Sequence, residues 1–293
     1  MIFGMTYYQI AWYFMIYSLA GWIIEEIYHA VNKGIIVNRG FLNGPLCPVY
    51  GLGALSIFAM SALIGQRGGG EQIENIPLWI LFIGGVILAT MIELIAGFLL
   101  DKLFHARWWD YSDKPFNLHG YICLEFSLIW GLIITFAMRV IQPYIRLHSF
   151  QNKIPARSGW LILAILYSVF LTDVIVTVIT INHLNKDLAE LDRMTKRLRR
   201  VSDGVTEVIG KTTIQTALAL QEGREKLQDQ AGENMDRALE ARDRLKKQRE
   251  EMIDKLTSAK VFGSGRLLSA FPQMKHREFD EILIEIRKSR KEK

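Results

Sequence analysis

The sequence predicts an all-α polytopic membrane protein, with about five transmembrane helices followed by a long charged, partly coiled-coil cytoplasmic helix. Two observations lead to this fold class. Half of the 293 residues are hydrophobic, and residues 186–293 carry 25 of the 35 Lys and Arg and 20 of the 30 Asp and Glu. The first 185 residues are therefore neutral and poor in charge, as expected of a body embedded in lipid. This distribution excludes a uniform soluble domain and a uniformly disordered chain.

Five apolar stretches are candidates for the membrane spans. A helix needs about 20 mostly apolar residues to cross a hydrocarbon core of roughly 30 Å, and the second stretch is short and rich in glycine. The start of the chain lacks the basic region and cleavage site of a signal peptide, so we expect the first span to be retained. The predicted spans are, in order, Tyr8–Val31, Pro48–Ile64, Pro77–Leu100, Leu118–Ile141 and Gly159–Ile181.

Basic residues outside the spans predict the orientation in a cell (inner or plasma) membrane. Five Lys and Arg follow the fifth span between Arg193 and Arg200, and such clusters stay in the cytoplasm. The C-terminus is then cytoplasmic, as are loop one (between the first two spans) and loop three (between the third and fourth spans). Loop four disagrees, because it carries Arg146, Lys153 and Arg157, but its basic cluster is the smaller one.

The same features divide the chain into four predicted segments. Residues 1–150 form a membrane domain of four helices, 151–184 the fifth span, 185–260 a long helix or coiled coil, and 261–293 a basic tail. The third segment has no proline, and Leu184, Leu188 and Leu191 follow heptad steps that glycines later interrupt. It is either a solvated helix or a surface for self-association or a soluble partner. The apolar run Phe279–Ile286 could lie on anionic lipid or fray as a terminus.

Several motifs are too weak to predict a cofactor, a metal or a nucleic acid partner. The two cysteines are too few for a disulfide framework or a four-ligand zinc site. One Glu-x-x-His at Glu26–His29 lacks the second copy that carboxylate metal sites need. The segment Gly204–Thr212 resembles a phosphate-binding loop, but it has five residues between its glycines where that motif has four. We therefore expect no nucleotide site in this chain.

Three glutamates from three predicted spans are the strongest functional signal. Ionisable groups in hydrocarbon are costly and usually have a partner and a function. Glu25, Glu93 and Glu125 each lie about two helical turns from loop one or loop three, which at 1.5 Å per residue is roughly 10–12 Å from the cytoplasmic surface. We expect the three carboxylates to share one leaflet, with the guanidinium of Arg39 as a bidentate partner.

Loops one and three supply the rest of the predicted site. Prolines and glycines in residues 38–53 break the start of the second span, and such backbone is tolerated at membrane depth only inside protein or beside water. In loop three, Asp110 suits a turn and Asn117 suits the cap of the fourth span. The predicted pocket holds a small substrate, an ion or a proton, or is an ion-pair network that only stabilises the bundle. Its candidate residues are Glu25, Arg39, Asn43, Tyr50, Glu93, Asp110, Tyr111, Ser112, Asn117 and Glu125.

Two long motifs resemble those of a known family. Residues 39–53 read Arg-Gly-Phe-Leu-x-Gly-Pro-x-Cys-Pro-x-Tyr-Gly-x-Gly and residues 109–112 read Trp-Asp-Tyr-Ser; Glu93, Phe-Asn at 116–117 and Gly120 accompany them. These residues are similar to the putative ABC-transporter type IV membrane family of bacterial cell membranes, over residues 10–150. The resemblance implies a permease, surrounded by membrane lipid and working with a separate ATPase subunit.

The leading hypothesis is therefore a transporter permease with a cytoplasmic-side polar pocket. It would work as a homo-oligomer through residues 185–260 or with a cytoplasmic partner recruited by that helix. One alternative is an intramembrane enzyme that acts on a lipid-linked substrate, because interfacial carboxylates beside a tyrosine and a cysteine could run acid–base chemistry. The other is a membrane-anchored scaffold or regulator. The sequence favours a non-enzyme without deciding the question.

Overall fold

The chain forms two compact units. The computed structural model describes residues 2, 4–34, 38–64, 73–148, 154–218, 224–258 and 263–291. Unit 1 comprises Met1–Ile181 with Val261–Arg277, and unit 2 comprises Asn182–Lys260 with Glu278–Lys293. The 63-residue helix α6 (Ala156–Leu218) contributes to both. Residues 261–293 are thus shared between the units.

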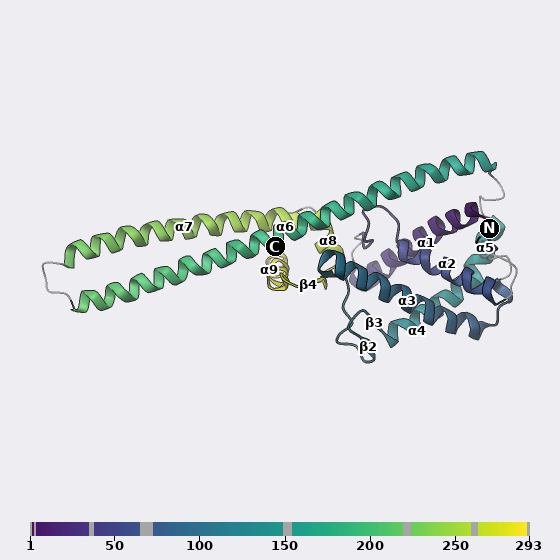
Figure 1. The fold of residues 1–293 in the computed structure, drawn as a ribbon, viewed down its shortest axis with the longest axis horizontal. Helices are drawn as coiled ribbons and strands as arrows, with labels where there is room; N and C mark the ends of the chain where they lie inside the picture. The colour runs from purple at the N-terminus through teal and green to yellow at the C-terminus, as the bar shows by residue number, and fades with distance from the viewer. Residues whose placement is uncertain are drawn as a thin grey trace. The chain divides into compact units, whose positions relative to one another are not determined.

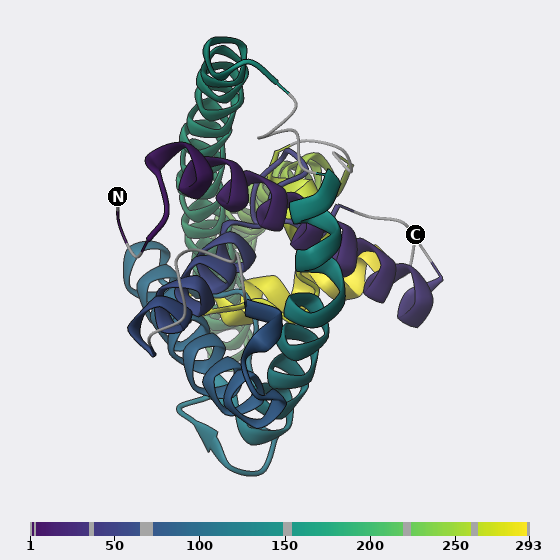
Figure 2. The same cartoon turned by 90° about the vertical axis from the view of Figure 1, so that its right-hand side faces the viewer.

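Unit 1 is a bundle of apolar helices in which α1 packs on α2, α2 on α3 and α3 on α4 (Figures 1 and 2). Four stretches of the described residues are long and apolar enough to cross a membrane, so the chain is a multi-pass membrane protein. The expected second span forms a helix of only 16 residues, and the count of five is not confirmed. The elements are α1 (Tyr7–Lys33), α2 (Pro48–Leu63), η1 (Ile73–Asn75), α3 (Leu78–Phe104), α4 (Leu124–Phe136), the π-helical turn η2 (Ala137–Ile141) and α5 (Gln142–His148).

Local chemistry sets the ends of the first two helices. Thr6 caps α1 through a reciprocal pair of hydrogen bonds with Gln9, and Gly34 ends it in the left-handed region at φ 68°. Pro48 starts α2 at a position where a missing N–H costs nothing. A Cβ on Gly21 would lie 2.1 Å from the ring of Tyr50, so this glycine allows α2 to approach α1 closely. The contact brings Tyr50 to the turn of α1 that carries Glu25.

The fourth span begins later than its apolar pattern predicts. Residues 117–123 form a hairpin of β2 (Asn117–Leu118) and β3 (Ile122–Cys123), and α4 begins at Leu124. The chain reverses through His119 and Gly120, which have φ of 51° and 75°, outside the helical region. The predicted start at Leu118 and the predicted role of Asn117 as its cap are therefore wrong; Cys123 is the N-cap.

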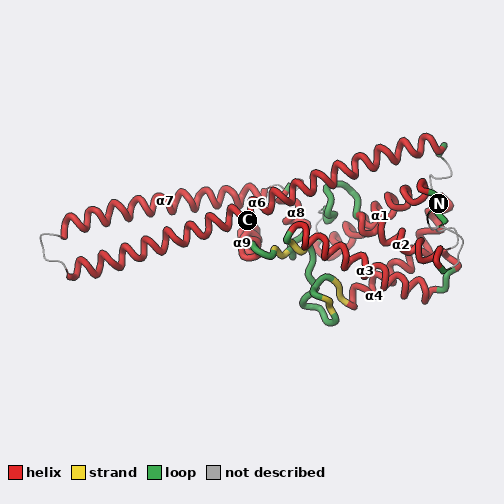
Figure 3. The backbone as a smooth tube through the Cα atoms, in the orientation of Figure 1, coloured by secondary structure: helices red, strands yellow, loops and turns green. Residues whose placement is uncertain are grey.

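A short segment after unit 2's helices returns to unit 1. It contains α8 (Ser264–Ala270) and β4 (Lys275–His276). β4 pairs antiparallel with β1 (Ala106–Arg107), with His276 opposite Ala106. Figure 3 shows short strand segments, in yellow, beside α8. Loop three is thereby extended by a strand from a part of the chain almost 170 residues away.

Unit 2 is built from the rest of α6, α7 (Arg224–Ser258) and α9 (Asp280–Lys291). The helices α6 and α7 run antiparallel, and Arg249 Nε donates to Thr195 Oγ1 at 3.0 Å between them (Figure 1). Residues 185–260 thus form two helices where the sequence suggested one. An ion pair of Arg249 with Glu285 joins α7 to α9. The fully or almost fully buried apolar residues of the unit are Leu184, Leu188, Leu191, Ile253, Leu256, Ile282, Leu283 and Ile286.

The heptad leucines of α6 and the apolar run Phe279–Ile286, whose partners the sequence did not indicate, are both packed inside unit 2. Leu188 and Leu191 are 0% exposed, and so is Leu283 on α9. The amphipathic run of α9 is therefore neither laid on lipid nor frayed, because its apolar face is buried inside unit 2. The charged faces of α6 and α7 remain exposed, as an interleaved charge pattern predicts.

Candidate functional site

Two of the three predicted glutamates lie together, each held by a tyrosine. Tyr50 of α2 donates its hydroxyl to Glu25 Oε1 of α1 at 2.8 Å. Tyr111 of loop three donates to Glu93 Oε1 of α3 at 3.1 Å. The two carboxyls are close enough to interact electrostatically. We call Glu25, Tyr50, Glu93 and Tyr111 the carboxyl cluster.

Aromatic rings surround Glu93 and leave part of its carboxyl unpaired. The side chain is 8% exposed, and Oε2 receives no hydrogen bond of ordinary geometry from a described residue. The indole of Trp130 interacts with the same carboxyl and meets the Tyr50 ring edge-on, with 5.4 Å between ring centroids. The Tyr111 ring stacks on Phe126 at 4.8 Å. The cluster is therefore enclosed by side chains from α2, α4 and loop three.

Unlike an ordinary ion-pair network, the cluster contains no ion pair between Glu25 or Glu93 and a basic side chain of the described residues. Ion pairs between described residues of unit 1 use Asp101, Asp110 and Glu125. The described residues also contain no group of three His, Cys, Asp or Glu side chains placed to hold a metal ion. What remains is two carboxyls from separate helices with neutral donors.

Two features hold the Tyr111 hydroxyl in place as a hydrogen-bond donor to Glu93: close packing at Gly97 and a raised pKa of Tyr111. A Cβ on Gly97, one turn after Glu93, would crowd the rings of Trp109 and Tyr121 at 3.2 Å, so the glycine lets loop three pack on α3. Burial and then the nearby Glu93 charge raise the pKa of Tyr111 well above its usual range. The hydroxyl is therefore protonated at physiological pH and donates to the carboxyl.

Two free thiols flank the cluster. Cys47 of loop one lies near Glu25, and Cys123 at the end of β3 interacts with Tyr111. Burial, followed by the charges of Glu25 and Glu26, raises the pKa of Cys47 to about 12. Because the thiolate is the nucleophile, Cys47 is a packed thiol and a poor nucleophile at neutral pH.

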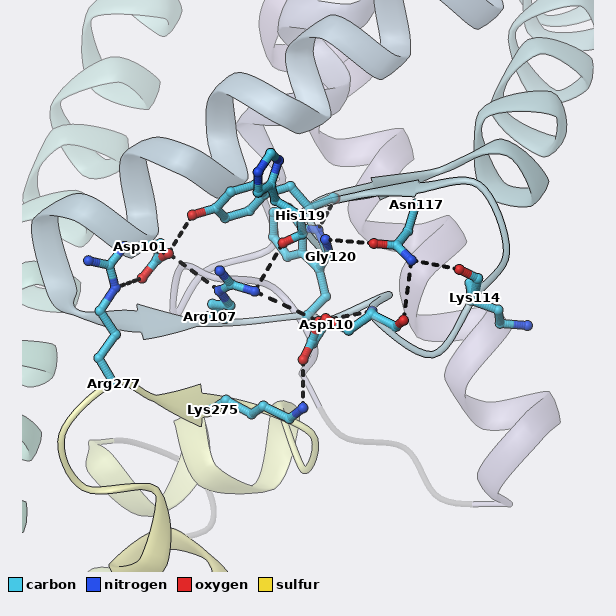
Figure 4. A network of polar contacts seen from close by, with 12 residues as sticks. Asp101, Arg107, Asp110, Lys114, Asn117, His119, Gly120, Lys275 and Arg277 are labelled. Carbon is cyan, nitrogen blue, oxygen red and sulfur yellow. Dashed lines mark hydrogen bonds and ion pairs between the residues drawn. The ribbon is translucent and has the colours of Figure 1, made fainter.

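Asp110 organises the turn that carries Tyr111 (Figure 4). Its Oδ1 accepts from the backbone N–H and hydroxyl of Ser112, at 3.0 and 2.5 Å, and its Oδ2 accepts from Lys275 Nζ at 2.6 Å. Burial raises the pKa of Asp110, but the bonds from Lys275 and Ser112 outweigh it and hold the pKa below its ordinary value. A Cβ on Gly120 would lie 2.4 Å from Asp110 Oδ1, which explains the glycine.

Asn117 and Asp101 complete the loop-three network (Figure 4). Asn117 Nδ2 donates to the carbonyl of Lys114 at 2.7 Å, and Asn117 Oδ1 accepts from the N–H of Gly120 at 3.1 Å. Asp101 is fully buried and accepts two bonds of 2.7 Å from Arg277. Its carboxyl also accepts from the hydroxyl of Tyr121 at 2.5 Å. This acid is saturated with donors.

Loop one is fixed to α6 and α8. The N–H groups of Asn43 and Gly44 donate to the Asp173 carboxylate at 3.0 and 2.7 Å, so Asp173 faces loop one. The guanidinium of Arg266 donates to the carbonyls of Gly40 and Phe41 at 2.8 and 3.1 Å. It also donates to Asn43 Oδ1 at 3.1 Å.

Two sequence-predicted site residues do not join the cluster. Glu125 lies in the first turn of α4, half-exposed, and pairs with Lys114 at 2.9 Å. The β2–β3 hairpin moves the helix start to Leu124 and so leaves Glu125 at the end of the helix instead of two turns inside it. The Arg39 side chain forms no ion pair with a described carboxylate; its backbone N–H donates to Glu26 at 2.6 Å.

The other predicted residues lie in loops one and three, and several residues with buried or charged contacts were missed. Asp110, Ser112 and Asn117 shape the turn beside Tyr111, and Asn43 links loop one to α6. Sequence reasoning missed Asp101 and Trp130 and assigned Arg266, Lys275 and Arg277 to a basic tail. The sequence does show a break in the helical pattern around Gly263 and Pro272. This break indicates a separate segment, but it does not indicate which residues the segment contacts.

The fold and the cluster together define a multi-pass α-helical membrane protein with paired acidic side chains within its bundle. A sequence model of the family described as Putative ABC-transporter type IV matches residues 12–178, and the chain belongs to that family. The resemblance inferred from the loop motifs is thereby confirmed, and it extends beyond residue 150 to include Asp173. No solved structure matches the chain.

Proposed function

We propose that this chain is the membrane subunit of a transport system, and that Glu25 and Glu93 form a binding site for a proton or a small monovalent cation. Family membership supports the membrane and transport role. The observation that carries the site is the pairing of two carboxyls from α1 and α3 that receive tyrosine hydroxyls and no cationic side chain among the described residues.

The energetics favour an exchangeable positive charge between the two acids. Two ionised carboxylates held close together in a membrane bundle repel one another and lose hydration, which costs several kcal/mol. A bound proton or cation removes both penalties. Tyr50 and Tyr111 each satisfy one oxygen, which leaves Glu93 Oε2 to contact the occupant. A divalent ion would need more oxygen ligands, so we propose an occupant with a single charge.

Of the ten predicted pocket residues, we assign different roles to two groups. Glu25, Tyr50, Glu93 and Tyr111 contact the occupant. Asp110, Ser112 and Asn117 form the turn that positions Tyr111. We place loops one and three and the C-terminus in the cytoplasm, because the five Lys and Arg between Arg193 and Arg200 outnumber the three of loop four. The site then opens toward the cytoplasmic face.

Coupling to ATP requires a second chain in this proposal. Gly204–Thr212 lies inside helix α6, and a phosphate-binding loop needs a strand and a glycine turn before its helix. We propose that the helices of unit 2 receive a separate ATPase subunit or a second copy of this chain. Their exposed, interleaved charges are compatible with either partner.

Proton release on cation binding tests the site. Sodium, potassium or an organic ammonium salt is added to the purified full-length protein in weakly buffered detergent solution, and released protons are measured with a pH dye. The wild type should release protons with saturation, because the cation displaces them from the acids. Glu93→Gln and Glu25→Gln should abolish the release, and Glu125→Gln, an exposed acid paired with Lys114, is the matched control.

The outcomes separate the two occupants. Saturable release with one cation identifies that cation as a competitor for the proton site. Proton uptake in a pH jump that is lost in Glu93→Gln, without any effect of added cations, identifies a proton site alone. If Glu93→Gln and Glu25→Gln behave as the wild type in both experiments, the proposed site is wrong.

A further inference from the structure

Residues 263–277 connect loop one to loop three, and we call them the strap. They follow the helices α6 and α7 of unit 2 in the chain but belong to unit 1. The strap lies outside the part of the chain that the family model matches, residues 12–178. Its contacts are made with the two loops that border the carboxyl cluster, so its position affects both.

One end of the strap is a buried anchor. Arg266 is 1% exposed and its guanidinium donates to four groups of loop one, between 2.8 and 3.4 Å. A buried arginine needs such partners, because an unpaired charge in the interior is very costly. Leu267 and Met274 are almost fully buried beside it. This half of the strap is therefore held strongly.

The other end is attached mostly by partly exposed polar contacts. Lys275 pairs with Asp110 and Arg277 with Asp101, and the two basic side chains are 52% and 43% exposed. The N–H of Arg277 donates to the carbonyl of His105 at 2.9 Å, and β4 pairs with only two residues of β1. Both basic side chains reach water, and Asp101 keeps its bonds from Tyr121 and Arg107 when Arg277 leaves, so this half opens more easily than the buried anchor.

The weaker end lies directly beside the carboxyl cluster. Lys275 holds Asp110, the next residue is Tyr111, and the Tyr111 hydroxyl donates to Glu93. Movement of Asp110 therefore moves the donor of Glu93. Between the two ends, the ring of Phe271 meets that of Trp108 at 4.9 Å. The geometry thus offers a firm attachment at loop one and a releasable one at loop three.

We propose that residues 275–277 are a latch that positions Tyr111 on Glu93, and that the latch opens while Arg266 stays anchored. Lys275 and Arg277 are positioning residues, because they act on the cluster through loop three. The consequence for the occupant rests on the proposed function; the opening of the latch does not. Because the strap follows α7 in the chain, a partner bound to unit 2 has a covalent route to the latch.

The maleimide labelling rates of the two native cysteines measure the accessibility of loop three and loop one separately. Cys123 is 2% exposed and closes the β2–β3 hairpin of loop three, whereas Cys47 lies in loop one. The full-length protein in nanodiscs is treated with a maleimide, and the rate at each cysteine is followed by peptide mass spectrometry. No cation or substrate is needed, so the readout is independent of the carboxyl site.

The latch variant is the double substitution Lys275→Gln/Arg277→Gln. It should raise the labelling rate of Cys123 by about ten-fold and leave Cys47 within about two-fold, because only loop three loses charge-assisted bonds. Lys275→Arg should label like the wild type, since the charge remains. The control is Arg237→Gln/Arg244→Gln, which removes two exposed arginines of α7. If Cys123 in the latch variant labels at the control rate, the proposal is overturned.

A disulfide that holds β1 and β4 together, which we call the lock, tests the same proposal if the latch variant does not fold. Ala106 and His276 face each other in the β1–β4 pair, and Ala106→Cys/His276→Cys places a disulfide across it. The oxidised lock should slow Cys123 labelling about ten-fold below the reduced form. Equal rates in the two forms would mean that the pair never opens, and would overturn the latch.

These results separate the latch from the proposed function. A responsive Cys123 with no effect of Glu93→Gln on proton release supports the latch and rejects the carboxyl site. A lost proton release in Glu93→Gln with unresponsive Cys123 supports the site and rejects the latch.

Discussion

Unit 1 contains two groups of acids with opposite surroundings. Asp101 and Asp110 are surrounded by arginine, lysine and hydroxyl donors. Glu25 and Glu93 receive one tyrosine hydroxyl each and no described cation. A saturated acid holds elements together, whereas an acid with spare acceptor capacity can exchange a partner. The comparison therefore separates structural carboxylates from the candidate binding site within one bundle.

The largest expected effect lies in the saturated group. Asp101→Asn should destabilise the protein by about 3 kcal/mol, because Arg277 and Tyr121 lose a fully buried charged acceptor. Thermal unfolding of the full chain in detergent, followed by size-exclusion chromatography, measures the change. Glu125→Gln should stay within about 0.5 kcal/mol, as expected for an exposed pair. An equal loss in both variants would remove the distinction between the two environments.

Glu93→Gln should have the opposite effect to Asp101→Asn: little change in stability and a loss of proton release. The amide keeps the Tyr111 bond and replaces a protonated, neutral acid of the same shape, so the stability should change by less than about 1 kcal/mol. Proton release should nevertheless be lost. A fall in stability comparable to that of Asp101→Asn would instead make Glu93 a structural acid.

Tyr111→Phe should have a smaller effect on the site. It deletes the hydroxyl bonded to Glu93 but keeps the ring stacked on Phe126. The loss of one hydrogen bond to a charged group is worth roughly 1.5 kcal/mol, so the affinity for the proton-displacing cation should fall about ten-fold. Cation titration of proton release checks this. Unchanged affinity would show that Tyr111 does not contact the occupied carboxyl.

The smallest effect concerns the thiol beside the cluster. With a pKa of about 12, Cys47 has very little thiolate at pH 8, and its maleimide rate should rise about ten-fold per pH unit up to pH 10. Glu25→Gln removes a nearby negative charge, which lowers the pKa and speeds labelling slightly; burial, the main cause, remains. A plateau near pH 9 would show that Cys47 is exposed.

Helical periodicity predicted that Glu25 and Glu93 lie near one another, as they do in the structure. Counting turns from the loops brought these two residues together, because both lie in regular helices whose geometry is fixed. The same count failed for Glu125, since the turn at His119–Gly120 replaced the first residues of the expected helix. The asparagine and the glycine beside the predicted helix start, Asn117 and Gly120, are the local signal for such a turn.

The contacts of the strap could not be predicted from sequence spacing. Arg266 lies more than 220 residues from its acceptors in loop one, and nothing local distinguishes it from the exposed arginines of α7. Its burial depends on the return of the chain after two long helices. Likewise, the heptad leucines predicted an apolar seam, but only the fold shows that unit 2 buries it within the chain.

Infrared difference spectroscopy of the full chain in lipid tests the central claim most directly. The carboxylic-acid C=O stretch is compared before and after addition of the cation that releases protons, or across a pH jump. We predict a band that disappears when the cation binds or the pH rises, is absent in Glu93→Gln, and is unchanged in Glu125→Gln. The same band in Glu93→Gln, or no band in the wild type, would contradict a proton-exchanging site at Glu25 and Glu93.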